Sequence, residues 1–133
     1  MRRLAALLLA AAPAGAQDVI SGGKLEALVE GRSLAWAYRG EAPYGLERYY
    51  PGQRVLWFRT ETRECMEGKW SEEGPPDDPA ICFMYQNDPL PHCWRVRGKG
   101  DVLLATPAQG GPSILTDLGP EHESPFGCGY LGL

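Results

Sequence analysis

Hydrophobic residues alternate with smaller or polar residues along most of this chain, with the period of two that is typical of β-strands. In RSLAWAYRG (32–40), Leu34, Trp36 and Tyr38 fall on one side of such a strand. In QRVLWFRTE (53–61), both phases of the alternation are apolar. A strand that is apolar on both faces occupies a central position in a sheet or belongs to a closed barrel.

Glycine and proline are abundant, with 17 and 12 of the 133 residues, so the regular elements must be short. About seven short strands separated by turn residues predict an all-β fold built as one antiparallel meander. We favour a small barrel, with a sandwich as the alternative.

One segment departs from the strand period. SGGKLEALVE (21–30) places Leu25, Leu28 and Val29 on one face of a short helix, and Gly31 follows as a stop signal. We expect this helix to pack at one end of the barrel.

The segment SEEGPPDDP (71–79) combines paired prolines with clustered acids, a composition that disfavours regular structure. We therefore expect an exposed loop with solvated carboxylates. The D-x-[DN]-x-[DN]-G spacing of a calcium-binding loop does not occur in it.

The first 16 residues have the pattern of a secretory signal peptide. Two arginines precede a run of leucine and alanine over residues 4–12, and AGA (14–16) supplies the small residues of a cleavage site. The run is shorter than the roughly 20 residues needed to span a bilayer. We expect the mature chain to begin at Gln17 and to form a single β domain over residues 17–133, periplasmic in a bacterium or secreted.

Removal of residues 1–16 leaves 11 basic and 17 acidic side chains, a formal charge of −6. An acidic domain without a basic stripe is poorly suited to binding a phosphate backbone. We expect a monomer with no nucleic-acid partner and no membrane span in its mature form.

The four cysteines, Cys65, Cys82, Cys93 and Cys128, allow three disulfide connectivities. In a hairpin centred on residues 87–88, position 82 lies opposite position 93. This register favours a Cys82–Cys93 bond and leaves Cys65 for Cys128, which would fasten the C-terminal tail. The rival pairing of Cys65 with Cys82 and Cys93 with Cys128 is nearly as symmetric about its own loop, so it remains open.

The cysteine spacing disfavours other sulfur chemistry. Gaps of 17, 11 and 35 residues do not match the C-x₂₋₄-C of zinc sites, and no C-x-x-C redox pair occurs. A thiol nucleophile needs a histidine base and an orienting third group, and we expect neither His92 nor His122 to serve. We therefore expect no metal, no cofactor and no catalytic residue.

Aromatic residues are numerous enough to line a ligand cavity in a small barrel. We single out Trp36, Trp57, Tyr49 and Glu47 as a possible binding surface, with Glu47 and Arg48 forming a polar edge. A domain of this size has little spare interior, so we expect a packed core rather than an open one.

The succession CMEGKW, ICFMY and CW follows the pattern C-x-x-G-x-W … I-C-F-x-Y … C-W. This pattern resembles that of small exported domains of unknown function in alphaproteobacteria, and the resemblance covers most of the mature chain. It implies export and a single β domain fastened by its cysteines, and it carries no catalytic residue.

These features favour an exported, non-enzymatic binding or interaction domain. We expect the 71–79 loop or an open barrel mouth to contact a protein, a glycan or a small ligand. An inhibitor of a lysozyme or a protease is the first alternative, because a rigid cross-linked barrel presents its loops at little entropic cost. A glycan-acting enzyme that uses Glu61, Glu64 or Glu67 is the second.

Overall fold

The computed structural model describes residues 18–119 and Cys128. The expected signal peptide (1–16), Gln17 and His122 lie outside these residues. The described elements are β1 (Asp18–Val19), α1 (Gly22–Val29), β2 (Ser33–Tyr38), β3 (Gly45–Tyr50), β4 (Arg54–Arg59), β5 (Cys65–Glu73), β6 (Ala80–Tyr85), β7 (His92–Lys99), β8 (Val102–Pro107) and β9 (Ile114–Asp117).

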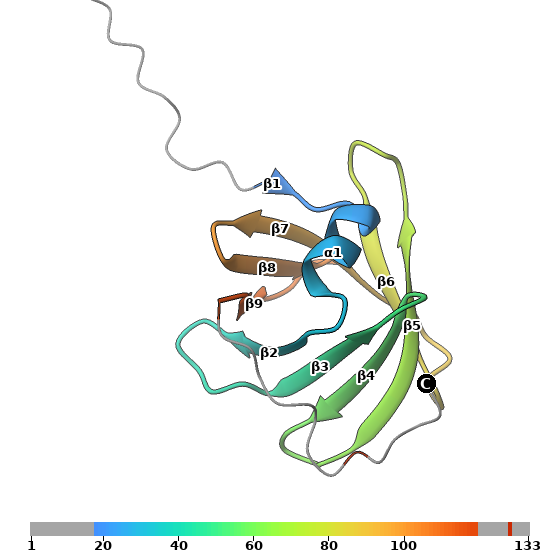
Figure 1. Ribbon diagram of the computed structural model, residues 1–133, viewed down its shortest axis with the longest axis vertical. Coiled ribbons are helices and arrows are strands. Elements are labelled where there is room, and N and C mark those ends of the chain that lie inside the picture. Colours follow the sequence, from blue (N-terminus) through green and yellow to red (C-terminus); the bar gives the residue numbers. More distant parts are fainter. Residues whose placement is uncertain (1–17, 120–127, 129–133) are drawn as a thin grey trace, which may run out of the picture.

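Eight antiparallel strands close into a barrel, in the order β7-β6-β5-β4-β3-β2-β9-β8, with β8 pairing back onto β7 (Figure 1). The short β1 continues the sheet beside the later part of β7, where Val19 lies opposite Arg97. The expected all-β barrel is confirmed, although the structure has more strands than the seven expected. A two-residue strand such as β1 is too short to show any alternation in the sequence.

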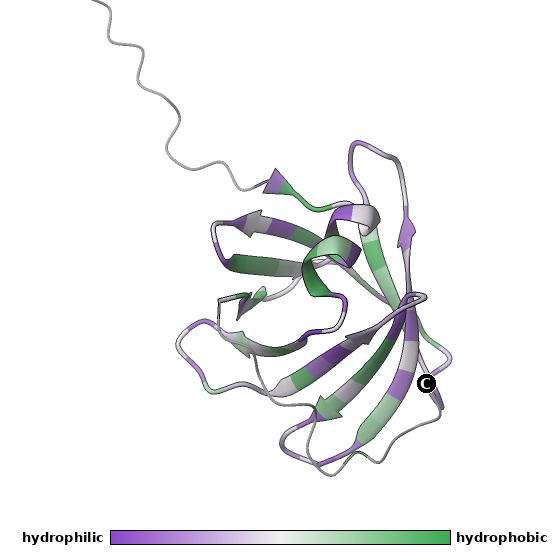
Figure 2. Cartoon of the chain, in the orientation of Figure 1, coloured by the Kyte–Doolittle hydropathy of each residue, from purple (hydrophilic) through white to green (hydrophobic). Residues whose placement is uncertain are grey.

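The two faces of each strand have different surroundings, as the alternation predicted. On β4, Val55 and Trp57 belong to the central hydrophobic cluster, whereas Leu56 and Phe58 are buried outside that cluster. Figure 2 shows hydrophobic and hydrophilic residues alternating along the strands. This strand is therefore apolar on both faces within a closed barrel.

Helix α1 lies across one end of the barrel (Figure 1). Its N-cap is Ser21, whose hydroxyl accepts a hydrogen bond from the Lys24 amide at 3.3 Å. Leu25 and Val29 are each 1% exposed and pack into the core cluster, and Gly31 follows with a φ of +77°. The helix predicted from the sequence is confirmed. No helix within the described residues has the length and apolar character that a membrane crossing requires.

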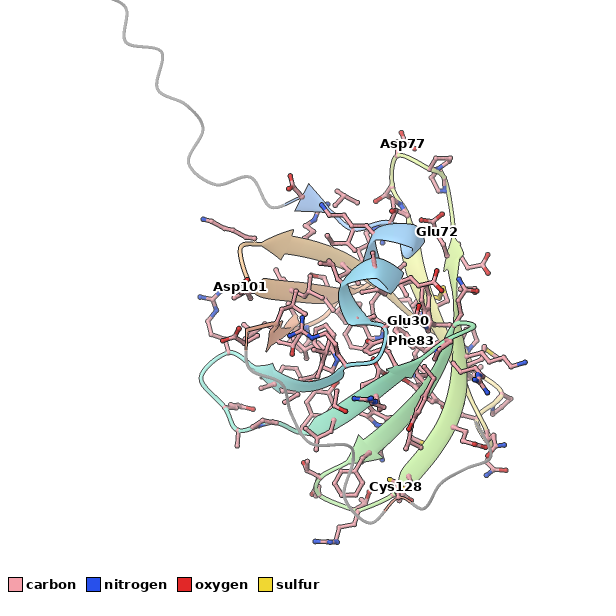
Figure 3. The ribbon with its side chains drawn as sticks, viewed as in Figure 1. Glu30, Glu72, Asp77, Phe83, Asp101 and Cys128 are labelled. Atoms are coloured by element: carbon pink, nitrogen blue, oxygen red, sulfur yellow. A yellow bond between two sulfur atoms is a disulfide. The ribbon has the colours of Figure 1, made fainter. Side chains whose placement is uncertain are left out.

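The acidic segment 71–79 differs from its prediction. Strand β5 extends to Glu73 and pairs with β6, with Ser71 opposite Cys82. The irregular loop begins only at Gly74, because sheet pairing outweighs the local preference of Ser71–Glu73. Its tip, marked by Asp77 in Figure 3, projects away from the barrel.

Both disulfides have the pairing that the hairpin register favoured. Cys82 bonds Cys93 between β6 and β7, and Ile81 lies opposite Trp94 in the same register. Cys65 bonds Cys128 over a separation of 63 residues, which fastens that point of the C-terminal region to the start of β5. All four cysteines are therefore paired, and no free cysteine remains.

Candidate functional site

The barrel interior contains a cavity of about 210 Å³. Its lining includes the buried Leu25 of α1 and the exposed side chains of Arg59 and His92, and the cavity is partly open to solvent. The expectation of a packed core is wrong for this part of the barrel. The lining combines large rings with a small residue, Ala105, whose methyl group takes up little of the enclosed volume.

A buried carboxylate, Glu47, lies in the wall of this cavity and is only 4% exposed. The Tyr49 hydroxyl donates a hydrogen bond to Glu47 Oε1, and the Tyr85 hydroxyl donates one to Oε2 at 2.8 Å. The Trp36 side chain is also close enough to act on the carboxylate, in the direction of a lower pKa. Tyr49, Tyr85 and Trp36 belong to three different strands, so only the closed barrel assembles them around Glu47.

Burial changes the acid–base behaviour of this group. Desolvation raises the pKa of Glu47 to about 7, although the hydrogen bonds from Tyr49, Tyr85 and Trp36 act to lower it. Burial also raises the pKa values of Tyr49 and Tyr85 well above 10, so both phenols stay neutral. Glu47 can therefore gain or lose its proton near neutral pH while its neighbours keep theirs.

Strand β3 positions Glu47 through simple alternation. Gly45, Glu47 and Tyr49 share the inner face, and Trp57 of β4 lies opposite Glu47 in the register. The Trp57 ring lies directly over Gly45, and a Cβ atom there would overlap the ring. The missing side chain at Gly45 thus lets Trp57 lie flat against β3.

Aromatic rings lead from the rim of the barrel to its interior. Tyr38 stacks on Tyr44 with ring centroids 5.4 Å apart, and Tyr44 meets Trp57 edge to face at the same separation. Deeper in, Phe83 stacks on Tyr85 at 6.2 Å. Aromatic rings therefore make up a large part of the cavity wall.

The charged groups at the mouth are paired with one another. His92 Nε2 lies 2.6 Å from Asp88 Oδ2, and this hydrogen bond lowers the pKa of Asp88. Arg59 lies 3.5 Å from Glu64. Arg59 therefore has an acidic partner at the rim, whereas Glu47 has no basic partner among the described residues.

The structure brings together the four residues predicted as a binding surface, but inside the barrel. Trp36, Trp57, Tyr49 and Glu47 are all buried and all line the cavity. The predicted polar edge of Glu47 and Arg48 is wrong, because adjacent residues of a strand face opposite sides. Arg48 lies on the outer face, over the ring of Tyr50 at 5.9 Å.

The polar lining residues Arg59, Asp88 and His92 were missed from the sequence. A signal for His92 was present. The hairpin register that pairs Cys82 with Cys93 also places His92 opposite Phe83, so the imidazole belongs to the same inward face.

The acids outside the cavity have other surroundings. None of Glu61, Glu64 and Glu67 lines the cavity. Elsewhere, the Glu72 carboxylate accepts a hydrogen bond from the Gly22 amide at 2.8 Å, and Arg95 donates to both oxygens of Asp78 at 2.9 and 3.1 Å. Over residues 18–119 and Cys128, no three His, Cys, Asp or Glu side chains group so as to hold a metal ion.

The chain matches no family model, no curated protein and no solved structure. Fold and site define a small disulfide-linked β-barrel with a solvent-connected interior cavity, partly aromatic, and one buried acid among the described residues. Its function is therefore argued from the chemistry of that cavity.

Proposed function

We propose that this protein is an exported, non-enzymatic binding domain that holds a small organic molecule inside its barrel. The observation that carries the proposal is the cavity of about 210 Å³ with Glu47 in its wall. Ligand sites are typically apolar concavities with a few converging polar groups, and barrel mouths are among their usual positions.

The dimensions of the cavity limit the ligand. An engineered protein cavity of about 150 Å³ is enough for a benzene molecule. A volume of about 210 Å³ therefore suits one ring, or a compact aliphatic group with a short substituent. Proteins and glycans would reach only the mouth, which makes a small ligand the preferred partner.

The amino-terminal pattern and the cysteines support export. Two disulfides are typical of proteins that reside in an oxidising compartment. Together with the signal-peptide pattern of residues 1–16 they support a periplasmic or secreted monomer, as the resemblance to small exported alphaproteobacterial domains also implies.

Native mass spectrometry of protein purified from its native periplasm tests this function. We expect a retained adduct with the mass of a small organic molecule. Ala105→Phe and Ala105→Leu place extra carbon atoms in the cavity, so both variants should lose the adduct while they remain folded by circular dichroism.

Ala37→Phe provides the matched control. Ala37 belongs to β2 but does not line the cavity, so the same enlargement there should leave the adduct in place. An adduct that survives in both Ala105 variants, or a wild-type protein that carries none, would contradict the proposal.

A further inference from the structure

Glu47 has no positive partner among the described residues. Its hydrogen-bond donors are the neutral phenols of Tyr49 and Tyr85, and no lysine or arginine is among the causes of its pKa shift. A carboxylate taken out of water without a cation is costly, because nothing replaces the lost hydration energy. The cavity wall therefore has a local deficit of positive charge.

Aromatic rings surround the same space. Trp36, Trp57, Tyr44, Tyr49, Phe83 and Tyr85 all line the cavity. The face of an aromatic ring is negative, so a cation over it is attracted, most strongly where water is excluded. Several such rings beside a carboxylate form a cage suited to an organic cation.

The basic groups of the mouth do not oppose a cation. Arg59 is paired with Glu64, and His92 is hydrogen-bonded to the Asp88 carboxylate, so each basic side chain at the rim has an acidic partner. The mature chain has a formal charge of −6, which favours the approach of cations. An anionic ligand would instead be repelled by the net negative charge of the protein and by the Glu47 carboxylate.

We infer that the ligand of this cavity is a small organic ammonium ion, held by the aromatic rings and neutralised by Glu47. The inference rests on the proposed binding function and specifies its ligand class. The ammonium group occupies the aromatic cage beside the Glu47 carboxylate, and the remainder of the ligand points toward the mouth.

Binding of a cation is coupled to the proton on Glu47. The titratable or charged groups that face this space are Tyr44, Tyr49, Tyr85, Arg59, Asp88 and His92, while α1, β5, β8 and β9 contribute apolar residues. The pKa of Glu47 is raised to about 7, so the free protein loses this proton as the pH passes neutrality. Ammonium affinity should rise over that range and then level off.

Two water-soluble probes of the same shape test the inference. Choline carries a quaternary ammonium group, and 3,3-dimethylbutan-1-ol is its neutral carbon analogue. Each probe is titrated into the oxidised mature protein by calorimetry. At pH 8, choline should bind at least tenfold more tightly than 3,3-dimethylbutan-1-ol. Choline binding should weaken at least tenfold at pH 5, whereas binding of the neutral alcohol should change little.

Three variants assign the effect to Glu47. Glu47→Gln keeps a hydrogen-bonding side chain without the charge, so choline should bind no better than the alcohol and should lose its pH dependence. Glu61→Gln removes the same charge from an exposed turn and should leave both affinities unchanged. His92→Gln should keep the pH dependence, which excludes the imidazole as its source.

The possible results separate this inference from the binding function beneath it. If the alcohol binds as tightly as choline, the ammonium inference is overturned while the cavity function stands. If neither probe binds, the ammonium inference is also overturned, and the retained-adduct measurement decides independently whether the cavity holds any molecule. If Glu47→Gln binds choline as tightly as the wild type does, the ammonium inference is likewise overturned.

Discussion

At the residue scale, Glu47 is the feature that most needs explanation. Its position on β3 follows from alternation, since it shares a face with Gly45 and Tyr49. The sequence could not indicate which face is inner, because Leu46 and Tyr50 make the opposite face apolar as well. A charged residue would ordinarily be assigned to the solvent face. Only the hydroxyls of Tyr49 and Tyr85, brought together by folding, make burial of the acid tolerable.

Burial of Glu47 predicts a specific dependence of stability on pH. Its pKa is raised from 4.5 to about 7 in the folded protein, so between these values the folded state binds more protons than the unfolded state. The free energy of unfolding should therefore fall as the pH rises from about 4.5 to about 7, by on the order of 3 kcal/mol. Above that range this contribution is constant.

The Glu47→Gln variant has no titrating group at position 47. Comparison with the wild type therefore gives the contribution of the Glu47 carboxyl group to stability. Urea denaturation at several pH values should show the difference in unfolding free energy, wild type minus Glu47→Gln, decreasing across that window. The difference in unfolding free energy between wild type and Glu61→Gln, a change at an exposed residue, should vary little with pH. A pH-independent difference for Glu47→Gln would show that the buried acid does not titrate there.

At the element scale, the β6–β7 hairpin was the most predictable part of the fold. One turn position fixed the whole register, including the Cys82–Cys93 bond and the pair of Ile81 and Trp94. The start of the 71–79 segment was not predictable, because Ser71–Glu73 owe their strand conformation to pairing with β6. The same extension of β5 carries Glu72 to the N-terminus of α1 (Figure 3).

Contact between β5 and α1 predicts unequal roles for two neighbouring acids. Glu72 accepts a hydrogen bond from the first amide of α1, at the positive end of the helix dipole. Glu72→Ala should therefore lower the free energy of unfolding by about 1 kcal/mol, as loss of a helix cap does. Chemical denaturation measures the change.

Glu73→Ala is the control for that substitution. Glu73 is exposed and accepts only from the Ser71 hydroxyl, at 3.1 Å, so its removal should change stability by less than about 0.5 kcal/mol. Equal losses for the two variants would mean that Glu72 does not anchor the helix.

At the scale of the whole molecule, barrel closure decides both stability and function. Pairing of β8 with β7 completes the ring of strands and encloses a volume that α1 covers at one end only. The two disulfides link β6 to β7 and residue 128 to β5, so they reinforce the barrel from its outer side and leave the cavity open.

Cross-linking and export give a prediction for the intact protein. The mature species should begin at Gln17, and its mass should be lower than that of the reduced chain by four hydrogen atoms. Mass spectrometry with and without a reductant measures this difference, and peptide mapping assigns the pairs. Delivery of a protein with free thiols, or with residues 1–16 retained, would contradict the export proposal.

The sequence by itself determined the all-β class, the short helix, the hairpin register and the favoured cysteine pairing. These depend on local periodicity, on turn residues and on symmetry about a single turn. Only the tertiary structure decided that the barrel is hollow and that Glu47 faces its interior. Both depend on how large rings from distant strands share one enclosed volume, and that packing has no signature in the order of residues along the chain.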